Sequence, residues 1–120
     1  MKKLLVAIAG ASLLHYAFPL IQVCETSMLP TYEDGEIVLA TRLFKKSNLK
    51  VGDVVVYKHD DRNVIKRIAD ISLDIRTGDL KFFCLGDNAK VSYDSREYGY
   101  ISSKDLVCKI INQRRFVQKQ

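Results

Sequence analysis

The sequence predicts a mainly β protein: a small antiparallel β-sandwich or barrel, preceded by one N-terminal transmembrane helix. Three observations predict this architecture. An uncharged, almost wholly apolar segment runs from Leu4 to Val23, short runs of apolar and β-branched residues follow it, and groups of Gly, Asp, Asn and Ser separate these runs. Short strands with frequent turn signals are typical of antiparallel sandwiches and barrels. We therefore expect a membrane anchor over residues 1–23 and a β domain over residues 24–120.

The apolar segment Leu4–Val23 has about the 20 residues that a helix needs to span a bilayer core. Lys2 and Lys3 precede it, so the N-terminus is expected in the cytoplasm and the β domain on the outer face. Pro19 weakens the segment, although proline is tolerated in lipid-embedded helices. The alternative is a cleaved secretory signal with a small-residue site at residues 9–11. Because apolar residues continue well past that site, a retained anchor is favoured.

The β domain is predicted from alternating apolar runs, which indicate strands, and from polar groups, which indicate turns. The expected strands span residues 36–41, 53–58, 64–71, 80–85 and 106–112. A hairpin loop is expected at 59–63, a second turn at 77–79, a long ordered loop at 86–99 and one helical turn at 103–105.

The net charge of +5 does not predict a nucleic-acid-binding protein. The basic residues form short groups of the kind found on solvated surfaces, and no basic stripe is interleaved with aromatic residues. Lys45 and Lys46 are placed to meet anionic headgroups if the domain lies at a membrane.

The three cysteines show no Cys-x-x-Cys spacing, so neither a metal site nor another cofactor is expected. Cys84 and Cys108 lie in apolar runs and are interpreted as buried free thiols. A disulfide between them is the alternative, which the sequence does not test.

A serine needs a neighbouring base to act as a nucleophile at neutral pH. The chain has two histidines, His15 in the apolar segment and His59 in a charged loop, and neither suits a Ser-His-Asp triad. A lysine with a lowered pKa is the remaining common base. In the run V-I-K-R-I-A, Lys66 shares a strand face with Val64 and Ile68, and burial there would lower its pKa. A lysine extending from a sheet edge into solvent is the simpler interpretation of the periodicity alone.

Ser27 lies in the run C-E-T-S-M-L-P-T-Y, just beyond the apolar segment. Pro30 fixes the local backbone and biases Leu29 towards an extended conformation, which suits rigid presentation of a serine. On these residues alone, an ordinary turn serine is the simpler interpretation.

Three segments resemble the signature boxes of the type I signal peptidase family. S-M-L-P-T followed by G-E-I-V-L-A, within residues 27–40, resembles the nucleophile box, and G-D-V-V-V-Y followed by I-K-R-I, within residues 52–68, resembles the lysine box. G-D-N-A-K-V-S-Y-D-S-R-E-Y-G, residues 86–99, resembles the third signature. The boxes fall in the family's order and cover most of the chain from 27 to 99. Only 18 residues lie between Arg67 and Gly86, so the larger second β domain of many relatives is expected to be absent.

The resemblance implies a membrane-bound serine endopeptidase that removes signal peptides from exported precursor proteins. Ser27 would attack the scissile carbonyl, and its backbone N–H would be one donor to the oxyanion. Lys66 would take the proton of Ser27 and return one to the leaving amine. Ser92 would hydrogen-bond to the lysine amine and orient it.

The resemblance also implies supporting residues for this site. Asp94 and Arg96 would form a structural ion pair, and Asp87 and Arg67 would give further support. Pairing Asp94 is needed because an uncompensated carboxylate near Lys66 would raise its pKa again.

Val23 and Ile65 align with family positions that line pockets for small side chains. The implied partners are exported precursors with small residues at P1 and P3, together with membrane lipid. A lysine base points to the bacterial or organellar branch of the family. The lack of a basic, serine-rich transit peptide favours the bacterial plasma membrane over the mitochondrial inner membrane.

The sequence departs from the family at Glu25, where relatives usually have Ser or Gly. An ionised carboxylate cannot donate to an oxyanion, and Thr26 is the candidate substitute. The usual G-x-P-G-D after the lysine box is replaced by A-D-I-S-L-D. Two alternatives stay open: a soluble, self-cleaving Ser-Lys protease of the SOS-repressor type, cut at Ala9-Gly10, and a catalytically decayed, membrane-tethered adaptor.

Overall fold

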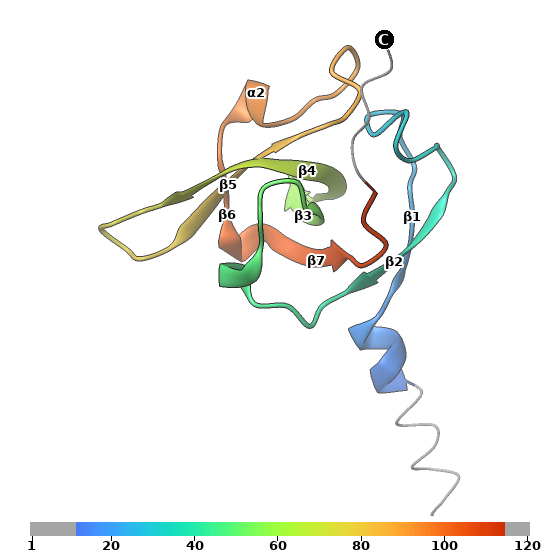
Figure 1. The fold of residues 1–120 in the computed structure, drawn as a ribbon, viewed down its shortest axis with the longest axis horizontal. Coiled ribbons are helices and arrows are strands. Elements are labelled where there is room, and N and C mark those ends of the chain that lie inside the picture. The colour runs from blue at the N-terminus through green and yellow to red at the C-terminus, as the bar shows by residue number, and fades with distance from the viewer. Residues whose placement is uncertain (1–11, 115–120) are drawn as a thin grey trace, which may run out of the picture.

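A computed structural model describes residues 12–114, in which seven strands form one antiparallel sheet. The strand order is β1-β2-β7-β3-β4-β5-β6. The strands are β1 (Leu20–Gln22), β2 (Ile37–Thr41), β3 (Val54–His59), β4 (Arg62–Leu73), β5 (Leu80–Leu85), β6 (Ile101–Ser102) and β7 (Leu106–Ile110). Short helical turns are η1 (Lys46–Asn48), α2 (Ser95–Tyr98) and η2 (Ser103–Asp105). In Figure 1 the sheet is strongly curved, and the β4–β5 hairpin projects away from β1 and β2.

The mainly antiparallel β fold predicted from the sequence is confirmed. All five predicted strands are present with small differences at their ends, and β5 and η2 have the predicted bounds. The sequence does not predict β1 or β6, because strands of two or three residues are too short to show an alternating pattern.

The predicted transmembrane helix is wrong at its C-terminal end. Residues 12–17 are helical, but β1 follows and pairs with β2 in the register Leu20↔Leu39. Pro19 explains this change, since proline lacks an amide donor and disfavours helical geometry in the residue before it. No helix within residues 12–114 is long and apolar enough to cross a membrane. Residues 1–11 of the predicted anchor lie outside the described residues.

Strands β3 and β4 carry buried apolar residues on both faces, and each face packs on a different cluster of buried residues. One cluster contains Val23, Met28, Tyr32, Val38, Ala40, Val54, Val56, Ile65, Cys108 and Ile110. The other contains Leu49, Val55, Tyr57, Ile68, Phe82, Cys84 and Ile101. Cys84 and Cys108 belong to different clusters and are both free, which confirms the prediction of buried thiols.

The turn between β3 and β4 consists of Asp60 and Asp61, both with positive φ, 50° and 61°. The flanking residues His59 and Arg62 are register partners. Two consecutive residues with positive φ are the signature of a type I′ turn, whose twist matches the twist of the two flanking strands. Glycine is the favoured residue at the second of these two positions. The polar loop predicted at residues 59–63 is therefore a two-residue turn inside a longer hairpin.

We expect Asp61→Gly to stabilise the protein by about 0.5 kcal/mol, because glycine removes the steric cost of a left-handed backbone. Equilibrium urea unfolding of the full chain measures the change. The matched control is Asp79→Gly in the next hairpin, where φ is not positive and glycine should destabilise. Equal destabilisation by both substitutions would contradict the assigned turn geometry.

Candidate active site

The structure brings Ser27 and Lys66 into direct contact, although 39 positions separate them in the chain. Lys66 Nζ donates a hydrogen bond to Ser27 Oγ at 2.8 Å. Both residues are buried, with 0% of Lys66 and 1% of Ser27 exposed to solvent. A buried lysine amine beside a serine hydroxyl has the geometry of a nucleophile paired with a base.

Ser27 lies in a turn that follows β1 and is fixed on both sides. Met28 and Tyr32, one and five residues further on, are fully buried in the first cluster. On the other side, the Asn88 amide N–H donates to the Ser27 carbonyl at 2.8 Å, and the Asn88 side chain donates to the Thr26 carbonyl at 3.2 Å. The hydroxyl of Ser27 is therefore presented from a backbone that has little freedom to move.

Lys66 lies in the middle of β4, on the face that packs against the second cluster. Its neighbours on that face, Val64 and Ile68, both pack there, as the strand alternation predicts. Burial lowers the pKa of the Lys66 amine, while the charge of Glu25 and then that of Asp94 act in the opposite direction. The lysine does not extend from a sheet edge into solvent.

Glu25 is the acidic residue that forms an ion pair with Lys66. Its Oε2 lies 3.8 Å from Lys66 Nζ, and 47% of its side chain is exposed. The sequence marks Glu25 as a departure from the family pattern but does not predict this contact, which depends on how the turn before Ser27 folds.

Asp94 is the centre of the third sequence box and is fully buried. Its carboxylate accepts hydrogen bonds from the Gly86 N–H at 2.8 Å, from Ser92 Oγ at 2.6 Å and from the Arg96 guanidinium at 2.6 and 3.0 Å. It also caps α2, together with Glu97. Burial alone would raise the pKa of Asp94, but these hydrogen bonds outweigh burial and lower it.

Ser92 lies near Ser27 on the other side of Gly86, and its hydroxyl donates to Asp94. Among residues 12–114 it forms no hydrogen bond with the Lys66 amine, in contrast to the sequence-based expectation. The charged carboxylate two residues further on is the stronger acceptor. Gly86 brings the two serines close: a Cβ at Gly86 would lie 2.1 Å from Ser92 Oγ and 2.7 Å from the Ser27 carbonyl oxygen.

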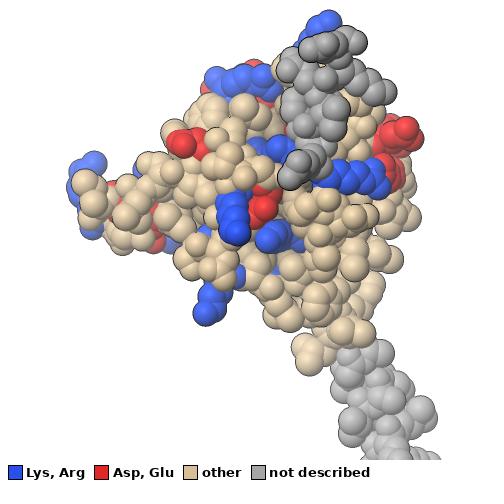
Figure 2. Space-filling view, viewed as in Figure 1, with Lys and Arg blue, Asp and Glu red and all other residues tan. Residues whose placement is uncertain are grey.

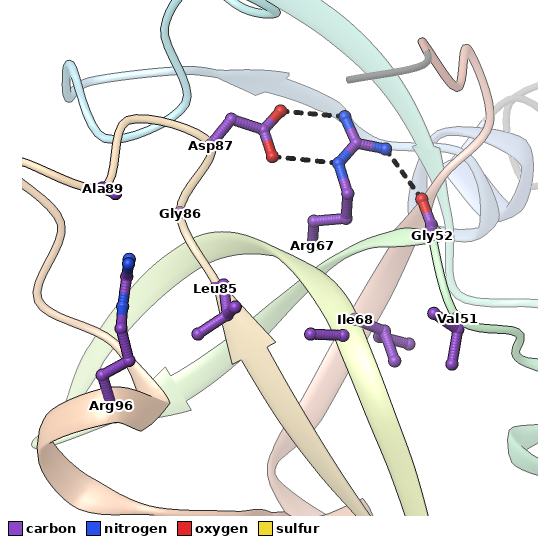
Figure 3. Close-up of a pocket in the computed structure, with 10 residues that line it drawn as sticks. Val51, Gly52, Arg67, Ile68, Leu85, Gly86, Asp87, Ala89 and Arg96 are labelled. Carbon is purple, nitrogen blue, oxygen red and sulfur yellow. Dashed lines mark hydrogen bonds and ion pairs between the residues drawn. The ribbon is translucent and has the colours of Figure 1, made fainter. Parts of the chain in front are cut away.

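Arg67 and Asp87 connect the strand that carries Lys66 with the third box. Arg67 Nε and Nη2 each donate to Asp87 at 2.9 Å, and Nη1 donates to the Gly52 carbonyl at 2.8 Å. Thr31 Oγ1, from the turn after Ser27, donates to the same carboxylate at 2.6 Å. Figure 3 shows Arg67 facing Asp87 at one rim of a pocket whose opposite side carries Arg96. The three boxes therefore meet at one half-buried carboxylate, Asp87, through an ion pair with Arg67 and a hydrogen bond from Thr31.

The two predicted pocket residues occupy different environments. Both belong to the first cluster, but Ile65 also lines a cleft together with Cys24, Glu25 and Val64, whereas Val23 is only 1% exposed. A second cleft, lined by Cys24, Glu25, Val64, His59 and Tyr93 among others, adjoins the first. Glu25, the ion-pair partner of Lys66, thus lines both clefts. Within the described residues, no cluster of His, Cys, Asp or Glu is suited to hold a metal ion.

A family model described as signal peptidase, peptidase S26, matches residues 1–74. The chain belongs to this family. The match includes Ser27 and Lys66 and ends before the third box, so it is independent of Ser92 and Asp94. No curated protein matches the chain. Members of the family are serine peptidases of the signal peptidase type, which act on exported precursors and are typically membrane-associated, and the chain is therefore a peptidase of this kind.

Asp94→Asn should destabilise the protein by about 3 kcal/mol at pH 7, because it leaves the Arg96 guanidinium and several donors without their anion. The pKa of Asp94 is lower in the folded protein than the value of about 3.9 that an unfolded chain has. The difference in unfolding free energy between wild type and Asp94→Asn is therefore fully present above about pH 4, and it shrinks as the pH falls below that value.

Urea unfolding of both proteins between pH 3 and 8 measures this difference. The control is Asp34→Asn, which removes the same charge from an exposed side chain that forms no hydrogen bond within the described part of the chain. That variant should stay within about 0.5 kcal/mol of wild type. A pH-independent loss in Asp94→Asn would contradict the assigned ion pair.

Proposed function

We propose that this protein is a membrane-bound serine endopeptidase that removes signal peptides from exported precursors by means of a Ser27–Lys66 dyad. The observation that carries the proposal is the buried 2.8 Å hydrogen bond between Lys66 Nζ and Ser27 Oγ. Neither His15 nor His59 contacts Ser27 within the described residues, so the lysine is the base that geometry favours.

The proposed chemistry requires the amine of Lys66 to be neutral. A neutral amine accepts the proton of Ser27 as the hydroxyl attacks the scissile carbonyl, and it returns a proton to the departing amine. Burial of Lys66 lowers its pKa and so increases the neutral fraction near neutral pH. The pairing of Asp94 with Arg96 supports this state, because it offsets the negative charge nearest to Lys66 within the third box.

The proposed oxyanion donor is the backbone N–H of Ser27. It forms no hydrogen bond to any residue between 12 and 114 and is free to donate to a substrate. Thr26 is exposed next to it and is the candidate for a second donor. Each such donor contributes on the order of 10²-fold or more to the rate.

The proposed substrate site is the pair of clefts beside Glu25. Ile65 at the edge of one cleft, backed by the buried Val23, would restrict the space to small side chains at P1 and P3. Ser92 lies close enough to Ser27, across Gly86, to assist in orienting the amine once substrate excludes water.

Exposed apolar residues support a position at a membrane surface. Leu13, Leu14 and Tyr16 of the 12–17 helix are each more than 60% exposed, as are Leu20 of β1 and Ile37 of β2. Figure 2 shows no charged side chain on the visible surface around this end of the described chain. Apolar patches of this kind mark membrane or protein contacts. We propose a cytoplasmic N-terminus and a domain on the outer face, most simply of a bacterial plasma membrane.

Lys66→Met should reduce cleavage of a test precursor with alanine at P1 and P3 by at least about a thousandfold, because no base remains. The fold should persist, since methionine fills a similar volume and removes a buried amine. Product formation and thermal unfolding are measured together. Lys58→Met, at an exposed position of β3, is the control and should cleave normally. Full activity of Lys66→Met or of Ser27→Ala would refute the dyad.

The kcat/KM for cleavage by the wild-type protein should increase with pH as one group, the amine of Lys66, loses its proton. Its midpoint should lie below the value of about 10.4 that an ordinary lysine has, because burial lowers the pKa of Lys66. The kcat/KM of the full chain in detergent, measured from pH 5 to 10, gives this midpoint. A profile that is flat over the whole range would contradict a lysine base.

A further inference from the structure

Glu25 occupies a position that the dyad itself does not require. Its carboxylate lies 3.8 Å from the Lys66 amine, and within residues 12–114 the side chain has no other ion-pair or hydrogen-bond partner. The other titratable groups facing the amine are Asp94, which is paired with Arg96, and the Cys84 thiol, whose pKa burial raises to about 12. Glu25 is therefore the anion near Lys66 whose charge no arginine offsets.

Glu25 is also placed where bound substrate would meet it. It lines both clefts beside the dyad and is about half exposed, whereas the side chain of Lys66 is only 1% exposed. Water reaches one side of the ion pair, and the protein interior encloses the other. A carboxylate at such an edge can turn towards solvent without disturbing the core.

We propose that Glu25 is an inhibitory counterion: in the substrate-free enzyme it pairs with Lys66 and favours the ammonium form, which cannot accept the Ser27 proton. Glu25 is thus a positioning residue that sets the pH at which Ser27 is activated. The inference rests on the proposed dyad and deepens it. It assigns a role to the one residue of the nucleophile segment that departs from the family pattern.

The expected size of the effect of Glu25 on Lys66 follows from the distance between their charged atoms and from the exposure of the Glu25 side chain. Two unit charges about 4 Å apart in a water-like environment interact strongly enough to change the pKa of a lysine amine by about 1. Because activity requires the neutral amine, removing Glu25 moves the acid limb of the pH profile to lower pH. If the midpoint of the profile falls by one pH unit in Glu25→Gln, its kcat/KM is up to about tenfold higher than that of wild type at any pH below both midpoints. On the alkaline plateau, where the amine is neutral in both proteins, the two kcat/KM values are equal.

The test compares the wild type, Glu25→Gln and the control Glu33→Gln, which removes a charge from an exposed side chain without a hydrogen-bond or ion-pair partner in the described part of the chain. The pH profile of kcat/KM is measured for each full-length protein. We expect the midpoint to fall by about one pH unit in Glu25→Gln and to stay in place in Glu33→Gln. Raising the salt concentration should reduce the difference between the midpoints of wild type and Glu25→Gln, because salt screens the partly exposed ion pair of Glu25 with Lys66.

A second readout does not depend on catalysis. The Lys66 amine is titrated by NMR in protein with ¹³C-labelled lysine, its signal being assigned by its absence in Lys66→Met. A lower titration midpoint in Glu25→Gln than in wild type supports the counterion, even if no precursor is cleaved and the proposed function fails. An unchanged or higher midpoint overturns the counterion, even if cleavage depends on Ser27 and Lys66.

Discussion

The structure depends on a lysine amine that is removed from water and placed against a serine hydroxyl. Burying an amine is unfavourable unless it loses its charge or gains a partner. Lys66 is fully buried in β4, with apolar residues of one cluster on its own face of the strand and residues of the other cluster on the opposite face. The surrounding polar groups are arranged around that constraint. Glu25 and Asp94 both favour the charged amine, but Asp94 is paired with Arg96, whereas the charge of Glu25 has no arginine beside it within the described residues.

The contact between Ser27 and Lys66 is supported by three distant segments that are fixed to one another. The turn that carries Ser27 is anchored by Met28 and Tyr32 in the core, and Asn88 holds its backbone from the third box. The ion pair of Arg67 with Asp87 connects β4 to that same box. The 2.8 Å hydrogen bond between Lys66 and Ser27 is therefore supported by core packing, by backbone hydrogen bonds and by an ion pair, and not by one loop alone.

The sequence predicts the strands well where apolar alternation and turn residues agree. The β5 strand and the η2 turn have their predicted bounds, and strand periodicity predicts that Lys66 shares a face with Val64 and Ile68. Burial of the amine itself did not follow from the periodicity alone. The pattern fails at β1, where a continuous apolar run looks like part of a helix and only pairing with β2 makes it a strand. Contacts such as Glu25–Lys66 and Ser92–Asp94 depend on loop conformation, which no local pattern encodes. The juxtaposition of Ser27 and Lys66 was predictable only through the family resemblance, since nothing local relates positions so far apart.

The most direct test of a neutral Lys66 acting on Ser27 is the acylation of the full-length protein by an active-site-directed serine probe. The modified residue is identified by mass spectrometry, and the rate is followed across pH in wild type and in Lys66→Met. A buried lysine base predicts that Ser27 is labelled, that the rate rises with deprotonation of the amine, and that labelling is lost in the variant. Labelling of another residue, or labelling of Ser27 at the same rate without Lys66, would contradict it.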